Sequence, residues 1–569
     1  MSLKVDRKKI ISVCIVAVVF VLAAFLCRPV FYLNDDVTMR SIMSGRYSGT
    51  PDGHAVYMKY PLTGVISMLY AVSDNVPWLE FFFAGCLIWA AAEAVSAMAG
   101  KGKGMFWELL FCILFLLPFF WYMHYTIIAA VLAGTAAFLL CTGKKGVSPA
   151  LLWILAWMVR SQVAYLSVPF LGVALLWKVS GMGKEHLREE CRGLGKTGGI
   201  AFACLLLCMG VNHLAYAAPA WQEYLEYNDV RTELFDYTNF HSTDYYSEHY
   251  EQYGMTEAEF IMLDSYNTML DASVDTEKIS EVADRVSGWM TQQRDETAWM
   301  KECVLRYYYQ LRYSDSMYVI LWLMMFALLT LLLVLGRSWL GLLLMVCLGG
   351  GRSLIWVYLI HQGRFPERII VSLYVIELLL LVGMLCNLPV KCKENLVKIK
   401  GKLTERWKLI PVICVGMQAV FVVAAACLLT EQVKAEGPKV LAQQKIQKEW
   451  NVLREYCESH EDTLYLIDVF SAVEYGGFQY ETDCGNMMLA GGWMSASPLA
   501  KQRFESRGAA DGGQALFEDT GTVFLAEDTA DVKWLENYLT ARFGVCTLEP
   551  VEKIVCSENK TFVEYHVVR

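Results

Sequence analysis

Long apolar runs alternate with short polar segments along the first 429 residues of the chain. The first run, "IISVCIVAVVFVLAAFLC" at residues 10–27, is about as long as a helix needs to cross a bilayer core of roughly 30 Å. Counted in this way, the pattern predicts about eleven membrane-spanning helices. The other ten runs lie at residues 77–99, 105–122, 125–141, 148–160, 163–177, 198–216, 316–335, 338–360, 369–386 and 409–429.

A cleaved signal peptide is the alternative interpretation of the first run. Its exit, "FLCRPVFYL", is bulky and lacks the small residues that a signal peptidase requires. Leu26 precedes Cys27, which also disfavours a lipoprotein signal. We therefore expect a retained first helix whose basic N-terminal end stays in the cytoplasm.

Lysine and arginine gather in every second connection between these runs. "KGKG", "GKK" and "KCKENLVKIKGKLTERWK" are typical of the basic set. The positive-inside rule places such connections in the cytoplasm. The segments 28–76, 217–315 and 430–569 are then external. The basic connections are 1–9, 100–104, 142–147, 178–197, 336–337 and 387–408.

The segment 217–315 is too long to be a simple connection. It holds 20 acidic residues and 7 lysines and arginines, a net charge of 7 − 20 = −13, and it is rich in tyrosine. "TEAEFIMLDSYNTML" and the stretch that begins "TEKISEVADRV" are expected to be helical, with Thr and Ser at plausible N-caps. Two interpretations remain: an external helical subdomain with solvated acids, or a lid that faces the substrate.

The last 140 residues have the pattern of a small α/β domain. A helix near 437–458 precedes "TLYLIDVF", and "GTVFLAE" predicts a second strand. "ADVKWLENYLTARFG" predicts an amphipathic helix that ends at Gly544. "GVCTLEPVEKIVC" and "KTFVEYHVV" are expected to pair as the closing strands. No glycine-rich phosphate loop is present in this part of the sequence.

Composition agrees with this division. The chain of 569 residues is 56% hydrophobic and 19% charged, with a mean hydropathy of +0.35. Soluble proteins of this size are rarely so apolar. We predict an α-helical polytopic membrane domain at 1–429 and an external α/β domain at 430–569, in a multi-pass protein of the cell membrane with a cytoplasmic N-terminus.

Most of the eighteen cysteines lie in predicted spans, where cysteine acts as a small apolar residue. Cys457, Cys484, Cys546 and Cys556 lie in the C-terminal domain, and their even number allows two disulfides with open connectivity. No Cys-x-x-Cys pair or histidine cluster indicates structural zinc.

The first external loop carries the most specific motif. "NDD", "SGRYSGTP" and "KYPL" follow the first helix in that order. This arrangement resembles the first external loop of the GT-C class of membrane glycosyltransferases, in particular the relatives of protein O-mannosyltransferase and of the lipid A aminoarabinose transferase. The resemblance covers residues 28–70 by motif and 1–429 by topology, and it implies a GT-C-like membrane domain.

By this resemblance, the protein would take a sugar from a polyprenyl-phosphate donor at the membrane boundary. An acceptor hydroxyl then needs a base, and Asp35 or Asp36 is the candidate. The family commonly has Asp-Glu or a spaced Asp pair where this chain has Asp-Asp, so the catalytic acid and the use of a divalent cation stay open. The alternative role of both acids is to cap the helix that follows.

The leaving phosphate needs cations, because charge must be stabilised where it develops. Arg160 ends a predicted span and Arg352 follows three glycines, and an arginine at membrane depth is usually functional. Arg364 and Arg368 lie on the next short external turn. The alternatives are an ion pair of Arg352 with Glu377, and snorkelling of Arg364 and Arg368 beside Glu367.

Three further residues are weaker candidates for substrate binding, namely His54, Lys59 and His361. The expected function is transfer of a sugar from a polyprenyl-phosphate-linked donor to a glycan, lipid or protein acceptor on the external face. An envelope polysaccharide polymerase or ligase is one alternative, and a transporter or flippase of lipid-linked precursors is another. A transporter would show internal repeats, and a polymerase would lack the acidic pair. The expected partners are the bilayer, the donor and the acceptor, without nucleic acid.

Overall fold

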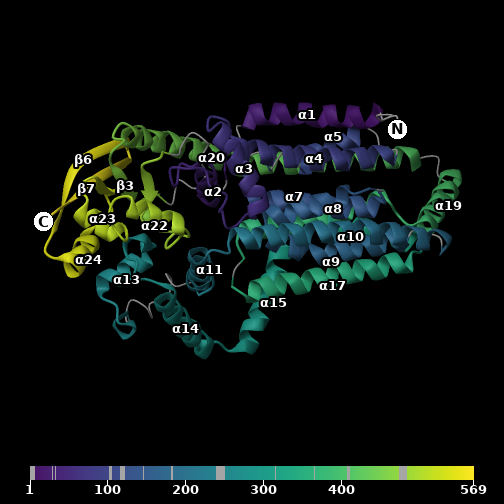
Figure 1. The fold of residues 1–569 in the computed structure, drawn as a ribbon. Helices are drawn as coiled ribbons and strands as arrows, with labels where there is room; N and C mark the ends of the chain where they lie inside the picture. The colour runs from purple at the N-terminus through teal and green to yellow at the C-terminus, as the bar shows by residue number, and fades with distance from the viewer. Residues whose placement is uncertain are drawn as a thin grey trace.

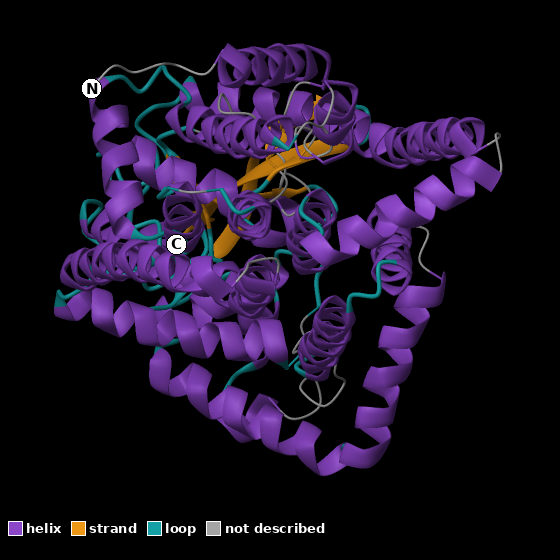
Figure 2. Ribbon diagram, turned by 90° about the vertical axis from the view of Figure 1, so that its right-hand side faces the viewer, coloured by secondary structure: helices purple, strands orange, loops and turns teal. Residues whose placement is uncertain are grey.

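The computed structural model is a long bundle of helices with a smaller α/β part at one end (Figure 1). Figure 2 shows that helices dominate the molecule and that the strands gather in one place. The structure describes residues 7–27, 30–31, 34–101, 105–115, 119, 122–144, 146–180, 184–238, 250–313, 316–363, 365–406, 410–472 and 484–569.

The bundle helices run side by side, with the N-terminus and α19 (Val390–Arg406) at one end and the α/β part at the other (Figure 1). The helices of the bundle are α1 (Arg7–Cys27), α4 (Trp78–Gly100), α5 (Met105–Phe115), α7 (Tyr125–Thr142), α8 (Ser148–Val159), α9 (Ser161–Ser180), α10 (Lys184–Ala215), α16 (Met317–Leu335), α17 (Trp339–His361), α18 (Glu367–Cys386) and the first part of α20 (Ile410–Glu458).

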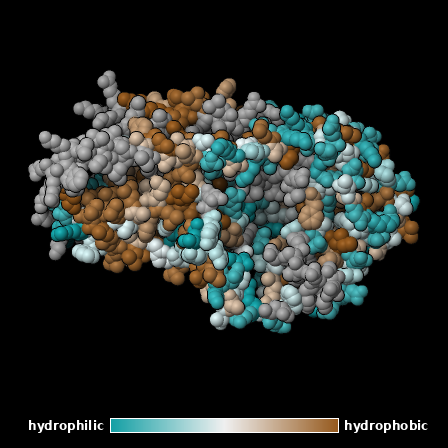
Figure 3. Space-filling view, turned by 180° about the vertical axis from the view of Figure 1, so that it is seen from behind, coloured by the Kyte–Doolittle hydropathy of each residue, from teal (hydrophilic) through white to brown (hydrophobic). Residues whose placement is uncertain are grey.

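Seven helices among the described residues are long and apolar enough to cross a membrane. The molecule is therefore an α-helical membrane protein, and the apolar surface of the bundle is separate from the hydrophilic surface of the α/β end (Figure 3). The seven spans are Trp78–Gly100, Tyr125–Thr142, Ser161–Ser180, Cys191–Ala215, Met317–Leu335, Trp339–His361 and Glu367–Cys386.

The predicted number of eleven spans is not confirmed. The apolar run at 148–160 forms α8, a helix of only 12 residues. At 1.5 Å per residue this helix is about 18 Å long, which is shorter than a bilayer core. Of the run at 105–122, α5 covers residues 105–115, and part of the remainder lies outside the described residues. The runs at 10–27 and 409–429 form α1 and the first part of α20, where many side chains lie outside the described residues. An apolar run shows hydrophobicity but does not show where a helix ends.

Helices α7 and α18 form the centre of the bundle. Two glycines let them approach closely: a Cβ at Gly134 would come within 2.7 Å of Leu379, and one at Gly383 within 3.0 Å of Phe138. Small residues at such contacts are typical of helix packing in membranes, where close van der Waals contact replaces the hydrophobic effect. Because both helices start at the α/β end of the bundle, this packing holds their first turns together.

The first loop is attached to the start of α7. Strand β1 (Val30–Phe31) pairs in parallel with β2 (Tyr122–Met123). Helix α2 (Asn34–Ser44) begins directly after β1, with Asp35 and Asp36 in its first turn. A short apolar helix, α3 (Tyr60–Val72), ends the loop and begins with Pro61 in its first turn.

The segment predicted as a long external loop is mainly helical, as expected. Thr256 and Glu259 form a capping box at the start of α13, and the Asp275 side chain caps α14. The elements of this segment are α11 (Pro219–Thr232), η1 (Glu233–Tyr237), η3 (Tyr250–Tyr253), α13 (Glu257–Asp264), η4 (Thr268–Leu270), α14 (Thr276–Gln293) and α15 (Glu296–Tyr313).

The C-terminal part is a five-stranded mixed sheet with the order β4-β3-β5-β7-β6. The two closing strands pair antiparallel, which confirms that prediction. Helix α20 runs through residue 430, so the predicted domain boundary falls inside one continuous helix. Cys457, Cys484, Cys546 and Cys556 are free thiols. The elements are β3 (Leu464–Ile467), α21 (Val469–Ala472), β4 (Met487–Leu489), α22 (Pro498–Glu505), α23 (Gly512–Glu518), β5 (Thr522–Glu527), α24 (Lys533–Phe543), β6 (Thr547–Ser557) and β7 (Lys560–Val568).

Candidate functional site

A cavity of about 940 Å³ lies where the bundle meets the helices of segment 217–315. The first loop contributes Asp35, Tyr57 and Lys59 to its wall. The bundle contributes the first turns of α7, α9 and α18, the junction between α8 and α9, and the end of α17. Helix α11, η1 and the end of α14 close the remaining side. Segments far apart in the sequence therefore form one site.

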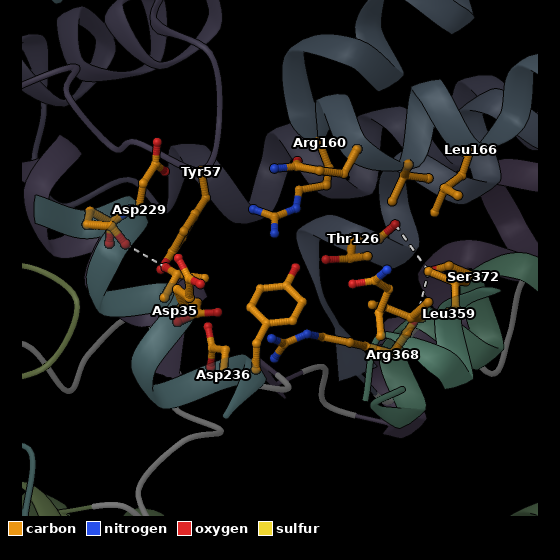
Figure 4. A pocket seen from close by; sticks show the side chains of 18 of the residues that line it. Asp35, Tyr57, Thr126, Arg160, Leu166, Asp229, Asp236, Leu359, Arg368 and Ser372 are labelled. Atoms are coloured by element: carbon orange, nitrogen blue, oxygen red, sulfur yellow. Dashed lines mark hydrogen bonds between the residues drawn. The ribbon is translucent and has the colours of Figure 1, made fainter. Parts of the chain in front are cut away.

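The two adjacent acids have different surroundings. Asp35 lines the cavity, and its side chain points into it (Figure 4). Asp36 is fully buried: one oxygen lies 2.7 Å from Nδ1 of His124, and the other accepts the backbone N–H of Tyr125 at 3.1 Å. Burial raises the pKa of Asp36, and the contacts with His124 and Tyr125 offset part of this shift. Asp36 thus fastens α2 to the start of α7, and this leaves Asp35 open to the cavity.

Arg160 is held in the cavity, and no anionic partner for it occurs among the described residues. It lies in extended backbone, with φ −154° and ψ 100°, between α8 and α9. Its guanidinium carbon is 5.1 Å from the ring centroids of both Tyr57 and Tyr125, which stack on each other at 6.3 Å. Cation–π contacts of this kind orient an arginine without neutralising it. Its buried Nη1 has no hydrogen-bond partner among the described residues. The group is positioned to bind an anion.

Three helix starts add to this positive character. Tyr125 and Thr126 of α7, Gln162 of α9, and Arg368 and Ser372 of α18 all line the cavity. A helix N-terminus carries a partial positive charge and free N–H groups, so anions bind there. The Ser372 hydroxyl joins two of these starts, because it lies 3.5 Å from the Thr126 carbonyl and 2.7 Å from the Arg368 carbonyl.

The opposite side of the cavity is acidic. Asp229 of α11 and Asp236 of η1 lie on the same side as Asp35, whereas Arg160 and Arg368 lie across the cavity (Figure 4). Glu233 lies on the same acidic side of the lining, on η1. The cavity is therefore polarised, with carboxylates facing guanidinium groups across open space. Such an arrangement suits a substrate that carries an anion at one end and needs a proton acceptor at the other.

The deeper wall of the cavity is apolar. Its residues come from α9, α17 and α18, which are three of the seven candidate membrane spans. The polar part of the site is thus continuous with a surface that an acyl or polyprenyl chain could contact. These residues are Val163, Leu166, Leu359, Ile369, Leu373 and Ile376.

Lys59 and His361 also line the cavity. The Lys59 amine lies 5.9 Å from the Trp157 ring, and burial together with the charge of Arg160 lowers the pKa of this amine. His361 lies 3.4 Å from Glu296 at the start of α15. Both residues fit the predicted substrate-binding role by position.

His54 lies outside the cavity. Its Nδ1 is 2.6 Å from Asp52, its Nε2 is 3.0 Å from the Ala215 carbonyl, and its ring stacks on Trp221 at 4.3 Å. Both ring nitrogens are therefore occupied. The residue joins the first loop to the end of α10, which is a structural role in place of the predicted substrate contact.

Arg352 does not line the cavity either, which corrects its predicted role in phosphate binding. It is 1% exposed, its Nε donates to Glu377 at 2.6 Å, and its Nη1 donates to the Tyr307 hydroxyl at 2.7 Å. Trp322 and Trp356 lie within 4.5 Å of its guanidinium carbon, measured to the ring centroids. The alternative of an ion pair with Glu377 is the observed arrangement. Arg364 lies outside the described residues.

The described residues that line the cavity do not form a metal-binding group. No group of three or more His, Cys, Asp or Glu side chains that could hold a metal ion occurs in the described part of the chain. Asp36, one of the two acids considered for a cation, faces His124 and the backbone of Tyr125. We therefore derive no step of the chemistry through a metal.

Sequence reasoning missed Tyr57, Tyr125, Asp229, Asp236 and Ser372. Tyr125 stands at the predicted outer end of a span, and this position was an available signal. Asp229 and Asp236 belong to the acidic segment for which a lid facing the substrate was one interpretation, and their place in the cavity agrees with it. Comparison of the chain with protein-family models, curated proteins and solved structures finds no match.

Proposed function

We propose that this protein is an integral-membrane glycosyltransferase of GT-C type that uses a polyprenyl-phosphate-linked sugar donor. The observation that carries the proposal is the polarised cavity, in which Asp35 faces Arg160 and Arg368 across open space. The first-loop motif "NDD…SGRYSGTP…KYPL" supports it independently.

In the proposed reaction, the acceptor hydroxyl oxygen attacks the anomeric carbon of the donor sugar. Asp35 takes the hydroxyl proton as the new carbon–oxygen bond forms. The bond between the anomeric carbon and the phosphate oxygen breaks, and its electron pair leaves with the polyprenyl phosphate. Arg160 and Arg368 bind the phosphate oxygens with charge-assisted hydrogen bonds. The products are the glycosylated acceptor and polyprenyl phosphate.

The shape of the site supports a lipid-linked donor. The apolar wall between α9, α17 and α18 adjoins the two arginines, so a phosphate at the arginines would place its chain on this wall. The acidic side, formed by α11 and η1, then borders the acceptor. A cytoplasmic N-terminus and an external C-terminal domain complete the proposal. The N-terminus and the basic helix α19 lie at one end of the bundle and the α/β part lies at the other (Figure 1). The positive-inside rule favours the cytoplasm for the basic end.

The test is turnover of a lipid-linked sugar by the purified protein in vesicles. Polyprenyl-phosphate sugars carrying different hexoses and pentoses are supplied together with lipid, glycan and peptide acceptors that carry free hydroxyl groups. The release of polyprenyl phosphate and the formation of glycosylated acceptor are measured by mass spectrometry. We expect release for at least one donor, and Asp35→Asn should abolish it. Movement of intact donor across the vesicle membrane without cleavage would instead support a flippase and contradict the proposal.

A further inference from the structure

A second cavity lies at the opposite end of the bundle. It has a volume of about 550 Å³ and is formed by the end of α7, the start of α8, the end of α9 and the first part of α10. Tyr125, at the start of α7, lines the first cavity, and Leu140, near the end of α7, lines the second. At 1.5 Å per residue these two residues are roughly 22 Å apart along this helix.

The wall of this cavity is basic and apolar. Four of its residues are basic, Lys144, Lys178, Arg192 and Lys196, and none of its described lining residues is acidic. Lys144 forms an ion pair with Glu93, so its charge is already neutralised. Lys178 is only 5% exposed, on the last turn of α9. Below these groups lies an apolar lining of Leu140, Pro149, Ala150, Trp153, Leu171 and Leu175.

Helix α10 leaves room for a ligand. No residue of its most apolar window is buried inside the protein, in contrast to 94% of the corresponding window of α7. Gly193 and Gly198 of α10 line the cavity, and a Cβ at either position would meet no atom within 4 Å. Open space therefore remains beside these two glycines, between this part of α10, the start of α8 and the end of α9.

We propose that this second cavity binds an anionic phospholipid, with its phosphate at Arg192 and Lys196 and an acyl chain on the apolar lining. An acyl chain suits the apolar wall, and a phosphate suits arginine and lysine at its rim. The proposed role of these basic groups goes beyond orienting the chain in the membrane, because orientation requires charge but no cavity beside the charge. This inference does not rest on the proposed transferase activity, since the two cavities share no lining residue.

The experiment measures lipid retention by native mass spectrometry of the full-length protein in detergent. Phosphatidylglycerol, phosphatidylcholine and inorganic phosphate are supplied separately. We expect retention of phosphatidylglycerol alone. The combined change Arg192→Gln and Lys196→Gln should weaken retention by roughly thirtyfold, because each basic residue contributes about 1 kcal/mol toward an anionic lipid surface. A matched control is Lys391→Gln with Lys398→Gln, which removes two exposed charges from α19 at the same end of the bundle.

A second variant separates the cavity from its charge. Gly198→Leu fills the hollow, keeps every basic residue and is tolerated by the helix backbone because nothing lies near its Cβ. We expect it to lower phosphatidylglycerol retention as well. Equal retention of phosphatidylcholine, equal binding of inorganic phosphate, or unchanged retention in Gly198→Leu would overturn the proposal and leave the charges with a role in membrane orientation only.

Discussion

The cavity around Arg160 and the closed cluster around Arg352 both place an arginine beside aromatic rings. Arg160 lies against two tyrosine rings, and its buried Nη1 has no hydrogen-bond partner among the described residues. Arg352 also has a buried nitrogen, Nη2, without a hydrogen-bond partner among the described residues, but its Nε donates to Glu377 at 2.6 Å. The same residue type therefore stabilises the fold where a carboxylate is supplied, and is ready for a ligand where none is.

The adjacent acids repeat this contrast over one peptide bond. Asp36 has His124 and a backbone N–H as partners, whereas Asp35 faces the cavity. Buried charged side chains that have hydrogen-bond partners stabilise the fold, whereas a charged side chain that faces a cavity is a candidate for catalysis or binding. The predictions below test whether this division is correct.

The largest effect is expected for Asp35→Asn. Loss of a general base typically costs roughly a hundredfold to ten-thousandfold in rate, so sugar transfer should fall by that amount with normal protein levels. Asp36→Asn is the matched control, because Asn can still accept the N–H of Tyr125. It should keep transfer within about tenfold of the wild type. An equal loss of sugar transfer in both variants would contradict the different roles assigned to Asp35 and Asp36.

Arg352→Gln should destabilise the protein without weakening donor binding. Removing one partner of a buried ion pair costs about 3–5 kcal/mol, because the other charge stays buried and unpaired. The melting temperature in detergent measures this loss. Replacing both partners, Arg352→Met with Glu377→Met, should recover most of it, since no unpaired charge remains. Weaker donor binding by this stable double variant would show that Arg352 takes part in donor binding.

Arg160→Gln should have the opposite profile. A charge-assisted hydrogen bond is worth about 1.5–3 kcal/mol, so affinity for the lipid-linked donor should fall roughly tenfold to hundredfold while the melting temperature changes little. Arg160→Lys should recover only part of the affinity, because lysine lacks the planar fork that binds two phosphate oxygens. An unchanged dissociation constant for the donor in Arg160→Gln would show that Arg160 does not bind the donor phosphate.

The smallest effect concerns Lys59. Burial and the nearby Arg160 lower its pKa from the ordinary 10.5. The folded protein loses this proton at lower pH than the unfolded chain, so the cost of the buried charge is present near neutral pH and is relieved as the pH rises toward 10.5. Lys59→Met should therefore raise the melting temperature at neutral pH, and the gain should shrink at alkaline pH. The gain should also be smaller in an Arg160→Gln background, and an equal gain there would exclude coupling of the two cations.

The sequence alone determined the local elements of this protein. Apolar runs of sufficient length predicted membrane helices, although a run does not show its helix ends, and α8 is too short to span a bilayer core. The C-terminal strands follow from short β-rich runs, and the helix that ends before Gly544 follows from its capping glycine. Both are properties of neighbouring residues. The adjacent acids Asp35 and Asp36 could likewise be recognised from the sequence alone.

Only the tertiary structure decided which charged groups are open and which are paired. Asp35 and Asp36 are neighbours in sequence, but the pairing of β1 with β2 places His124 beside one of them alone. Arg352 and Glu377 lie on consecutive helices, and only the packing of α17 near α18 brings their atoms to 2.6 Å. The energy of a charge depends on the partners and the solvent within a few ångströms, and in a folded chain most of these partners come from distant residues.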